Sequence, residues 1–235
     1  MKLISQRLLF REILPTDTKD FVQISKDIAQ NFSKTMLQDE KTYPKNLCQK
    51  YNIAPELNDE KTWFNPFENL SFPYLENAQK FVNNAIEKTN IVPRDNYILA
   101  LEKIDEPNKL VGAIMFSSIP KAGRTHDLCG YFGFFIAPQF QGQGYITEAF
   151  SVVINFLYKE LLPTLGFSNY DNIFMFATAH PLNIPSEKLQ LKFGGKTNGE
   201  VFITPSGKFR KAYYFDPQIT LNLDFIKNVQ YKVQT

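Results

Sequence analysis

Residues 131–148, YFGFFIAPQFQGQGYITE, join an apolar run to a proline and then to a glycine-rich turn. The aromatic and apolar run up to Ala137 predicts a buried strand, which Pro138 ends. After the turn, apolar residues recur at three- and four-residue spacing, as in a helix with one buried face: Ile146, Ala149, Phe150, Val153, Ile154 and Leu157. The stretch therefore predicts a strand, a tight turn and a helix in direct succession.

The turn has the composition of an anion-binding loop. Gln139, Gly142 and Gly144 spell Q-x-x-G-x-G, and glycine has no Cβ that would keep backbone amides from a bound oxygen. The free N–H groups at the start of the following helix also favour anions. We therefore predict a phosphate-binding turn.

Two better-known phosphate motifs are excluded by their spacing. A dinucleotide fingerprint would need a third glycine where Thr147 stands, and no lysine follows Gly144. The sequence GGKT at residues 194–197 is not a Walker loop, because Gln190 occupies the place of its first glycine.

The chain resembles the GNAT N-acetyltransferases, whose acyl-CoA loop carries (Q/R)-x-x-G-x-(G/A) between a strand and a helix. Two further segments resemble the branch that acetylates ribosomal-protein N-termini, the RimJ/RimL type. One is the pattern N-x-x-S-x-x-x-x-x-K-x-G, which is matched by Asn183, Ser186, Lys192 and Gly194. The other is QRLLFREIL at residues 6–14 with Asp17, which resembles R-L-x-L-R followed by an acidic helix cap. Three such segments in the right order are hard to obtain by chance.

We expect a single domain over residues 1–235. Periodicity and turn signals predict strands at 8–14, 96–104, 109–119, 131–137, 173–179, 196–204 and 209–216, with helices inserted between them. This order predicts an α+β fold, a mixed and mostly antiparallel sheet of six to seven strands flanked by helices. The resemblance implies that the central strands at 131–137 and 173–179 splay apart to form the acyl-CoA site.

Residues 34–73 form an aromatic-rich insertion with little periodicity, too aromatic for a disordered linker. Long ordered loops are often lids, so this insertion either binds substrate or extends the core as a satellite cluster. Its Phe-rich patches would form a homodimer interface if they are exposed.

Composition excludes several classes of partner. The 26 basic and 24 acidic residues give a net charge of +2, too small to favour nucleic acid. The apolar segments are shorter than the ~20 residues that span a membrane, and two distant cysteines suit a reducing compartment. We therefore expect a cytoplasmic protein without a membrane segment. Two histidines and two cysteines supply no zinc-ligand spacing, so no metal is expected.

The resemblance implies acetyl-CoA as co-substrate. Backbone N–H groups of the turn would hold its pyrophosphate, namely those of Gln141, Gly142, Gln143, Gly144, Tyr145 and Ile146. Backbone groups of Phe135 and Ile136 would bind the pantetheine arm, and the N–H of Ile136 would polarise the thioester carbonyl. Asn183 would bind the arm, Lys192 would contact the cofactor, and the Ser186 hydroxyl would protonate the leaving sulfur. Helix capping is the alternative role of Asn183 and Ser186.

The general base stays open. Many relatives carry a glutamate at the place of Tyr131, and a phenol with a pKa of about 10 is a poor base near neutral pH. Asp127 is preferred over His126 and Glu102, because an acid at the strand entrance could take the proton through a water. Gln190 replaces the tyrosine that many acetyltransferases use as general acid.

Together these features predict an acetyl-CoA-dependent N-acetyltransferase that acts on a primary amine, with a protein or peptide N-terminus as the preferred acceptor. A polyamine or aminoglycoside is the alternative acceptor, and it would suit the acidic residues of the insertion: Asp39, Glu40, Glu56, Asp59 and Glu60. The missing glutamate and tyrosine favour a third interpretation, a non-catalytic module that binds acyl-CoA.

Overall fold

The structure is a computed structural model that describes residues 1–31, 75–90, 94, 96–117, 128–164, 166, 173–203 and 209–234. The predicted insertion at 34–73 lies outside the described residues, as do His126 and Asp127. The strands are β1 (Lys2–Ile4), β2 (Leu8–Glu12), β3 (Asn96–Lys103), β4 (Leu110–Ser117), β5 (Leu128–Ile136), β6 (Ile173–Ala179), β7 (Val201–Ile203), β8 (Phe209–Phe215) and β9 (Lys232–Gln234). The helices are α1 (Thr18–Asn31), α4 (Leu75–Thr89), α5 (Tyr145–Phe156), α6 (Leu162–Thr164), α7 (Ile184–Lys192), α8 (Pro217–Thr220) and α9 (Asp224–Lys227).

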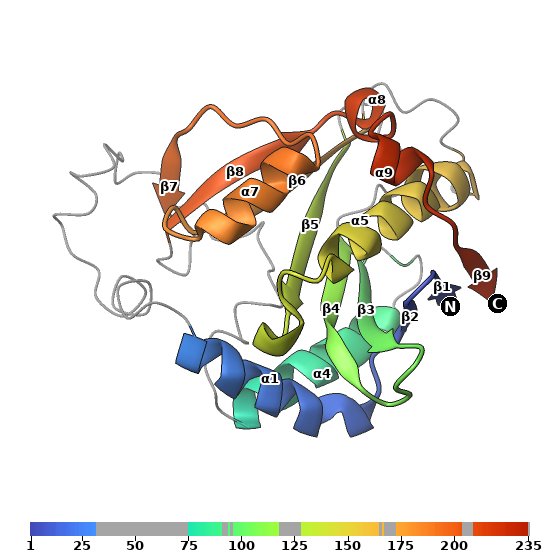
Figure 1. The fold of residues 1–235 in the computed structure, drawn as a ribbon, viewed down its shortest axis with the longest axis vertical. Coiled ribbons are helices and arrows are strands. Elements are labelled where there is room, and N and C mark those ends of the chain that lie inside the picture. The colour runs from blue at the N-terminus through green and yellow to red at the C-terminus, as the bar shows by residue number, and fades with distance from the viewer. Residues whose placement is uncertain are drawn as a thin grey trace, which may run out of the picture.

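The strands of the described residues form one nine-stranded sheet in the order β7-β8-β6-β5-β4-β3-β2-β1-β9. The predicted α+β class and the mostly antiparallel sheet are confirmed. The two strands beyond the predicted six to seven are β1 and β9, each of three residues, which pair with each other at one edge. Their pairing brings the two ends of the chain side by side (Figure 1). Three residues carry too little alternation for a sequence pattern to reveal them.

The centre of the sheet contains its one parallel pair among the described strands. β5 and β6 pair from Leu128↔Ile173 to Tyr131↔Phe176. Beyond that point β5 stays paired only with β4 and β6 only with β8, so the two strands diverge (Figure 1). We call the diverging portions, residues 132–136 and 177–179, the splayed edges. Their separation is the one that the family resemblance implied.

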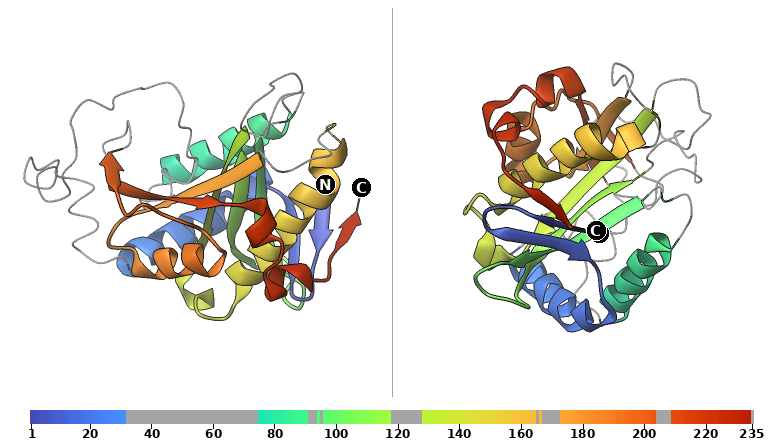
Figure 2. Two further views of the ribbon diagram at one scale, coloured as in Figure 1. Left: turned by 90° about the horizontal axis from the view of Figure 1, so that it is seen from above. Right: turned by 90° about the vertical axis from the view of Figure 1, so that its right-hand side faces the viewer.

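Helices cover both faces of the sheet. α1 and α4 lie together on one face and α5 on the other (Figure 2). On the first face, the ring of Phe135 lies 5.8 Å from that of Phe21 in α1 and 6.2 Å from that of Phe81 in α4. We call this the α1/α4 face. Tyr131 lies four residues before Phe135 in β5. Because residues an even number apart in a strand point to the same face, Tyr131 belongs to the α1/α4 face as well.

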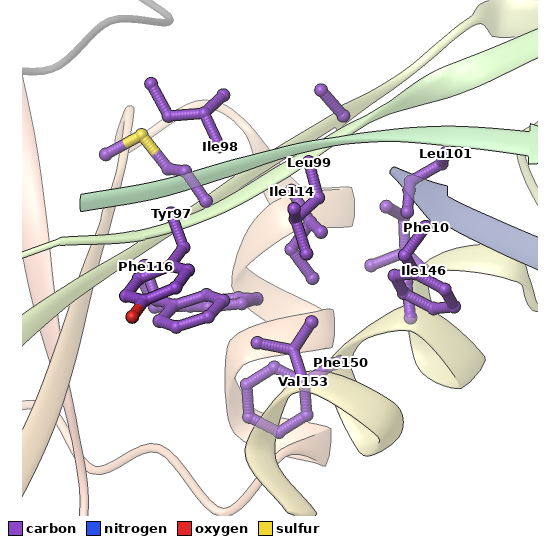
Figure 3. Packing of buried hydrophobic residues seen from close by; sticks show 14 of the residues in the cluster. Phe10, Tyr97, Ile98, Leu99, Leu101, Ile114, Phe116, Ile146, Phe150 and Val153 are labelled. Carbon is purple, nitrogen blue, oxygen red and sulfur yellow. The ribbon is translucent and has the colours of Figure 1, made fainter. Parts of the chain in front are cut away.

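The opposite face packs on α5, and we call it the α5 face. Figure 3 shows side chains of β2, β3 and β4 directed at Ile146, Phe150 and Val153 of α5, while Ile98 points the other way. The Phe150 ring stacks on Phe193 at 3.9 Å and meets Phe132 of β5 edge-on at 4.8 Å. Because Phe150 is completely buried, this aromatic cluster fixes the middle of α5 against the sheet.

A buried ionic network secures the opening segment. Arg11 of β2 donates to Asp17 at 2.8 Å and to Glu102 of β3 at 2.7 Å. The hydrogen bond to Asp17 raises the pKa of Arg11, so the guanidinium stays charged. Glu102 also accepts from the N–H of Asn108 at 2.9 Å. Asp17 also accepts from the N–H of Leu14 at 2.8 Å, so Asp17 and Glu102 are both structural residues of this network.

Candidate active site

The predicted phosphate-binding turn, residues 138–144, joins β5 to α5. A single 3₁₀ turn, Pro138–Phe140, is followed by extended Gln141, and then by Gly142 and Gly144 with φ values of +73° and +82°. These are left-handed conformations that favour glycine. A Cβ placed on Gly142 would meet nothing within 4 Å, so the space beside its backbone is open. Both glycines of the predicted motif are thus required by the backbone itself.

Free amides converge where this turn enters α5. The first hydrogen bond into the helix runs from the N–H of Glu148 to the C=O of Gly144 at 3.0 Å. The preceding N–H groups, from Gly144 to Thr147, have no carbonyl of an earlier helical turn to bind. Tyr145 and Ile146 bury their side chains, so only their backbone is available to a ligand. The fit to a phosphate group is good, because a helix start presents N–H donors and positive potential.

The two glutamines of the turn are held within it. Gln143 Nε2 donates to the Gln139 C=O at 2.8 Å, and Gln141 Nε2 donates to the Ile136 C=O at 3.4 Å. Both side chains are exposed. Their bonds brace the turn against its own backbone and against the end of β5.

The backbone of β5 determines which residues reach the splayed edge. The N–H of Ala137 donates to Val111 at 2.8 Å, and the Phe135 carbonyl lies only 2.2 Å from the place that a Cβ on Gly112 would take. Both groups therefore face β4. Since successive residues of a strand point their backbone groups to opposite sides, Ile136 and Phe134 face the splayed edge. Ile136 and Phe134 therefore present their backbone groups to the splayed edge, whereas Phe135 presents its carbonyl to β4.

The start of α7 is a capped turn. Asn183 is the N-cap, and its Oδ1 accepts from the N–H of Ser186 at 3.2 Å. Asn183 N–H in turn donates to the His180 C=O at 2.8 Å, and His180 Nδ1 accepts from the N–H of Leu182 at 3.1 Å. The capping role that sequence allows for Asn183 is thus present, and its amide nitrogen stays available as a donor. Ser186 is half-buried in the first turn of α7.

Lys192 lies at the other end of α7, beside the start of α5. Its Nζ donates to Thr147 Oγ1 at 3.2 Å and lies 5.3 Å from the centre of the Phe225 ring. The side chain is exposed. Lys192 and Thr147 are 45 residues apart in the chain. Their contact places the positive charge of the lysine beside the free amides of the turn.

Tyr131 lies on the α1/α4 face, away from the phosphate-binding turn. It is buried, its ring meets that of Phe176 edge-on at 5.2 Å, and its hydroxyl lies 3.5 Å from Thr178 Oγ1. This position is where β5 and β6 begin to diverge. Tyr131 therefore stands on the opposite side of the sheet from the anion site, at the mouth of the splayed edges.

Three residues that sequence reasoning missed tie α7 to β8. Lys211 Nζ donates to Glu187 Oε1 at 2.8 Å, and this hydrogen bond lowers the pKa of Glu187. Burial raises the pKa of the Tyr213 phenol, which also hydrogen-bonds Glu187. Glu187 directly follows Ser186, so these contacts fix the helical turn that carries the serine. Lys211 and Tyr213 share a face of β8 by simple alternation, but their pairing with α7 is not visible in sequence.

The described residues contain no group of three or more His, Cys, Asp or Glu side chains that could hold a metal ion. Among the helices in this part of the chain, none is long and apolar enough to cross a membrane.

Comparison with known families identifies the family of this chain. A family model of the GNAT acetyltransferase domain matches residues 7–196, from the opening strand to the end of the turn that follows α7. The chain belongs to the GNAT acetyltransferase family. The sequence-based assignment to this family is therefore confirmed, and the chain is an acetyltransferase. No curated protein matches the sequence.

Solved structures share this fold at low sequence identity. A GNAT-family acetyltransferase from Bacillus anthracis is 18% identical, with a TM-score of 0.55 over 93% of this chain and 99% of that one. A spermidine N-acetyltransferase SpeG chimera from Vibrio cholerae and hSSAT is 15% identical, with a TM-score of 0.54 over 92% and 99%. RimL, a ribosomal L7/L12 alpha-N-protein acetyltransferase in complex with coenzyme A, is 12% identical, with a TM-score of 0.53 over 91% and 96%.

Proposed function

We propose that this acetyltransferase moves an acetyl group from acetyl-CoA to the primary amine of a protein or peptide N-terminus. The observation that carries the proposal is the glycine turn at the start of α5, where free amides and the Lys192 cation meet next to the splayed edges. The solved RimL and SpeG structures make amines the natural class of acceptor. The three-segment likeness to the RimJ/RimL branch favours the protein N-terminus. Since acetyl-CoA is needed, the proposal includes a cytoplasmic location.

The pyrophosphate of acetyl-CoA would be bound by the backbone N–H groups of residues 142–147, with Lys192 supplying a positive charge. Gln141 leaves the predicted set, because its N–H donates to the Pro138 C=O at 3.1 Å. The pantetheine arm would follow the splayed edge of β5, where Phe134 and Ile136 direct their backbone groups. The free amide nitrogen of Asn183 would donate to the arm from the α7 side. The open space beside Gly142 fits the first of these roles, because a phosphate oxygen needs the volume that a side chain would fill.

In the reaction, the neutral amine attacks the thioester carbon, a C–N bond forms and the C–S bond breaks. The N–H of Ile136 would stabilise the negative charge that develops on the carbonyl oxygen. The Ser186 hydroxyl would hydrogen-bond the leaving thiolate and relay a proton to it, taking up a proton from water in the same step. The proton lost by the amine would pass through water to Asp127, with Tyr131 directing the acceptor from the α1/α4 face.

The test combines binding with turnover. Acetyl-CoA binding is measured by calorimetry, and thiol release is then followed after addition of N-terminal peptides, spermidine or an aminoglycoside. Binding together with release by peptides alone supports the proposal. Release by spermidine or the aminoglycoside would replace the acceptor with a small-molecule amine. Acetyl-CoA binding without thiol release by any of these amines would favour a non-catalytic acyl-CoA module. No acetyl-CoA binding would refute the proposed site.

A further inference from the structure

Arg7, in the turn between β1 and β2, reaches across the fold to the phosphate-binding turn. Its Nε donates to Glu148 Oε2 at 2.6 Å, and its Nη1 donates to the Gln143 C=O at 2.9 Å. Its guanidinium lies over the Tyr145 ring, 4.5 Å from the centre. The backbone N–H of Arg7 adds a bond to Glu148 Oε1 at 2.9 Å, and Ser5 Oγ donates to the same oxygen at 2.7 Å.

These contacts surround a glycine in the left-handed conformation. Gly144 is the N-cap of α5, has a φ of +82° and provides no side chain to cap the helix. Its neighbours on both sides, Gln143 and Tyr145, are the ones that Arg7 contacts. Arg7 Nη2 itself comes within 3.5 Å of the place that a Cβ on Gly144 would take. Because glycine loses more conformational freedom on ordering than any other residue, this turn needs support from outside.

We propose that Arg7 is a positioning residue for the coenzyme A pyrophosphate, because its planar fork holds the turn in the conformation that aims the free amides at one point. The inference rests on the proposed acyl-CoA site and goes beyond it, since it assigns a role in cofactor affinity to a residue outside the loop. Glu148 balances the charge of Arg7 through an ion pair at 2.6 Å. The role of Arg7 is therefore to hold the geometry of the turn. A lysine cannot take this role, because its single ammonium group cannot bind the Glu148 carboxylate and the Gln143 carbonyl while a planar group stacks on the Tyr145 ring.

The chain offers a closely matched control. Arg94 donates to Glu12 at 2.7 Å and to the Asn96 C=O at 2.9 Å, and it lies over the Tyr97 ring at 4.3 Å. It thus makes the same three kinds of contact as Arg7. Its partners belong to β2 and β3, not to the phosphate-binding turn, so Arg94→Gln removes an equivalent set of interactions elsewhere.

The first measurement is amide hydrogen exchange in the ligand-free protein, on peptides that span residues 141–148. The protected amides there are those of Gln141 and Glu148, which donate to the carbonyls of Pro138 and Gly144. Loosening the turn exposes its amides to local opening, so exchange should be at least about fivefold faster in Arg7→Gln and Arg7→Lys than in the wild type. Arg94→Gln should leave exchange in these peptides unchanged. Thermal unfolding of each variant verifies that it is folded.

The second measurement is the Kd for CoA by calorimetry. We expect it to rise at least about tenfold in both Arg7 variants, the scale of one charge-assisted contact, and to stay at the wild-type value in Arg94→Gln. Unchanged exchange, or wild-type CoA affinity in Arg7→Gln, would overturn the inference, and rescue by Arg7→Lys would show a role of charge instead of geometry. If the wild-type protein binds no CoA, both the proposed function and the role of Arg7 in CoA affinity are refuted. Exchange would then still report whether Arg7 holds the turn, which keeps the two failures distinct.

Discussion

Replacing Gly142 with valine separates the stability of the phosphate-binding turn from its function. Gly142 has a φ of +73°, and a Cβ there would meet no protein atom within 4 Å. The cost to folding is therefore backbone strain alone, about 1–2 kcal/mol for a left-handed residue with a Cβ. Against a typical unfolding free energy of about 5–15 kcal/mol, the variant stays folded. For a chain of this size we expect the Tm to fall by roughly 2–8 °C.

Binding should respond far more strongly than stability. The valine side chain would occupy the space beside the Gly142 backbone, which in our proposal is where phosphate oxygens lie. Two charge-assisted hydrogen bonds, each of about 1.5–3 kcal/mol, would be lost, so the affinity for CoA should fall at least about 100-fold. Calorimetric titration of CoA into Gly142→Val measures this loss, and a thermal unfolding scan of the same sample gives the Tm.

Gly199→Val is the control for this experiment. Gly199 has a φ of +83°, is exposed and likewise has no protein atom within 4 Å of the place that a Cβ would take, but it lies in the turn before β7. It should show a similar fall in Tm and wild-type CoA affinity. Wild-type affinity in folded Gly142→Val would refute the assignment of this turn to the pyrophosphate.

Three further variants test other parts of the site. Ser186→Ala keeps the backbone N–H that donates to the Asn183 cap of α7, so acetyl-CoA affinity should change by less than about twofold while kcat for thiol release falls at least about 100-fold. Lys192→Met removes an exposed cation, so CoA binding should weaken by about two- to fivefold at low salt, and the difference should vanish in titrations at about 1 M NaCl. In Glu187→Gln the partner of Lys211 is lost. Because the Lys211 hydrogen bond lowers the pKa of Glu187 below its ordinary value of 4.5, the carboxylate stabilises the fold above that pH, and this contribution disappears as pH falls through the folded-state pKa. The Tm of the wild type should therefore exceed that of the variant at neutral pH and converge with it in acid, and a constant difference down to about pH 3 would contradict the assignment.

Sequence reasoning succeeded where a local signal is strong. The strand, turn and helix around Gly142 and Gly144 follow from apolar periodicity and from glycines that the backbone requires at positive φ. The cap at Asn183 likewise depends on residues only three positions apart. Phe135 shows the limit, because the direction of its carbonyl depends on the register with β4, which one strand's sequence does not contain.

The sequence by itself determined the family, the kind of sheet and the glycine turn before α5, since each depends on short-range patterns or on an ordered set of motifs. Tertiary structure alone decided which groups meet. Arg7 and Glu148 are 141 residues apart, and Lys192 and Thr147 are 45 apart. Such pairs carry no periodic signature, because their distance is set by how β2, α5 and α7 pack on the sheet. The same is true of β1 and β9, which become strands only because the folded chain brings its two ends together.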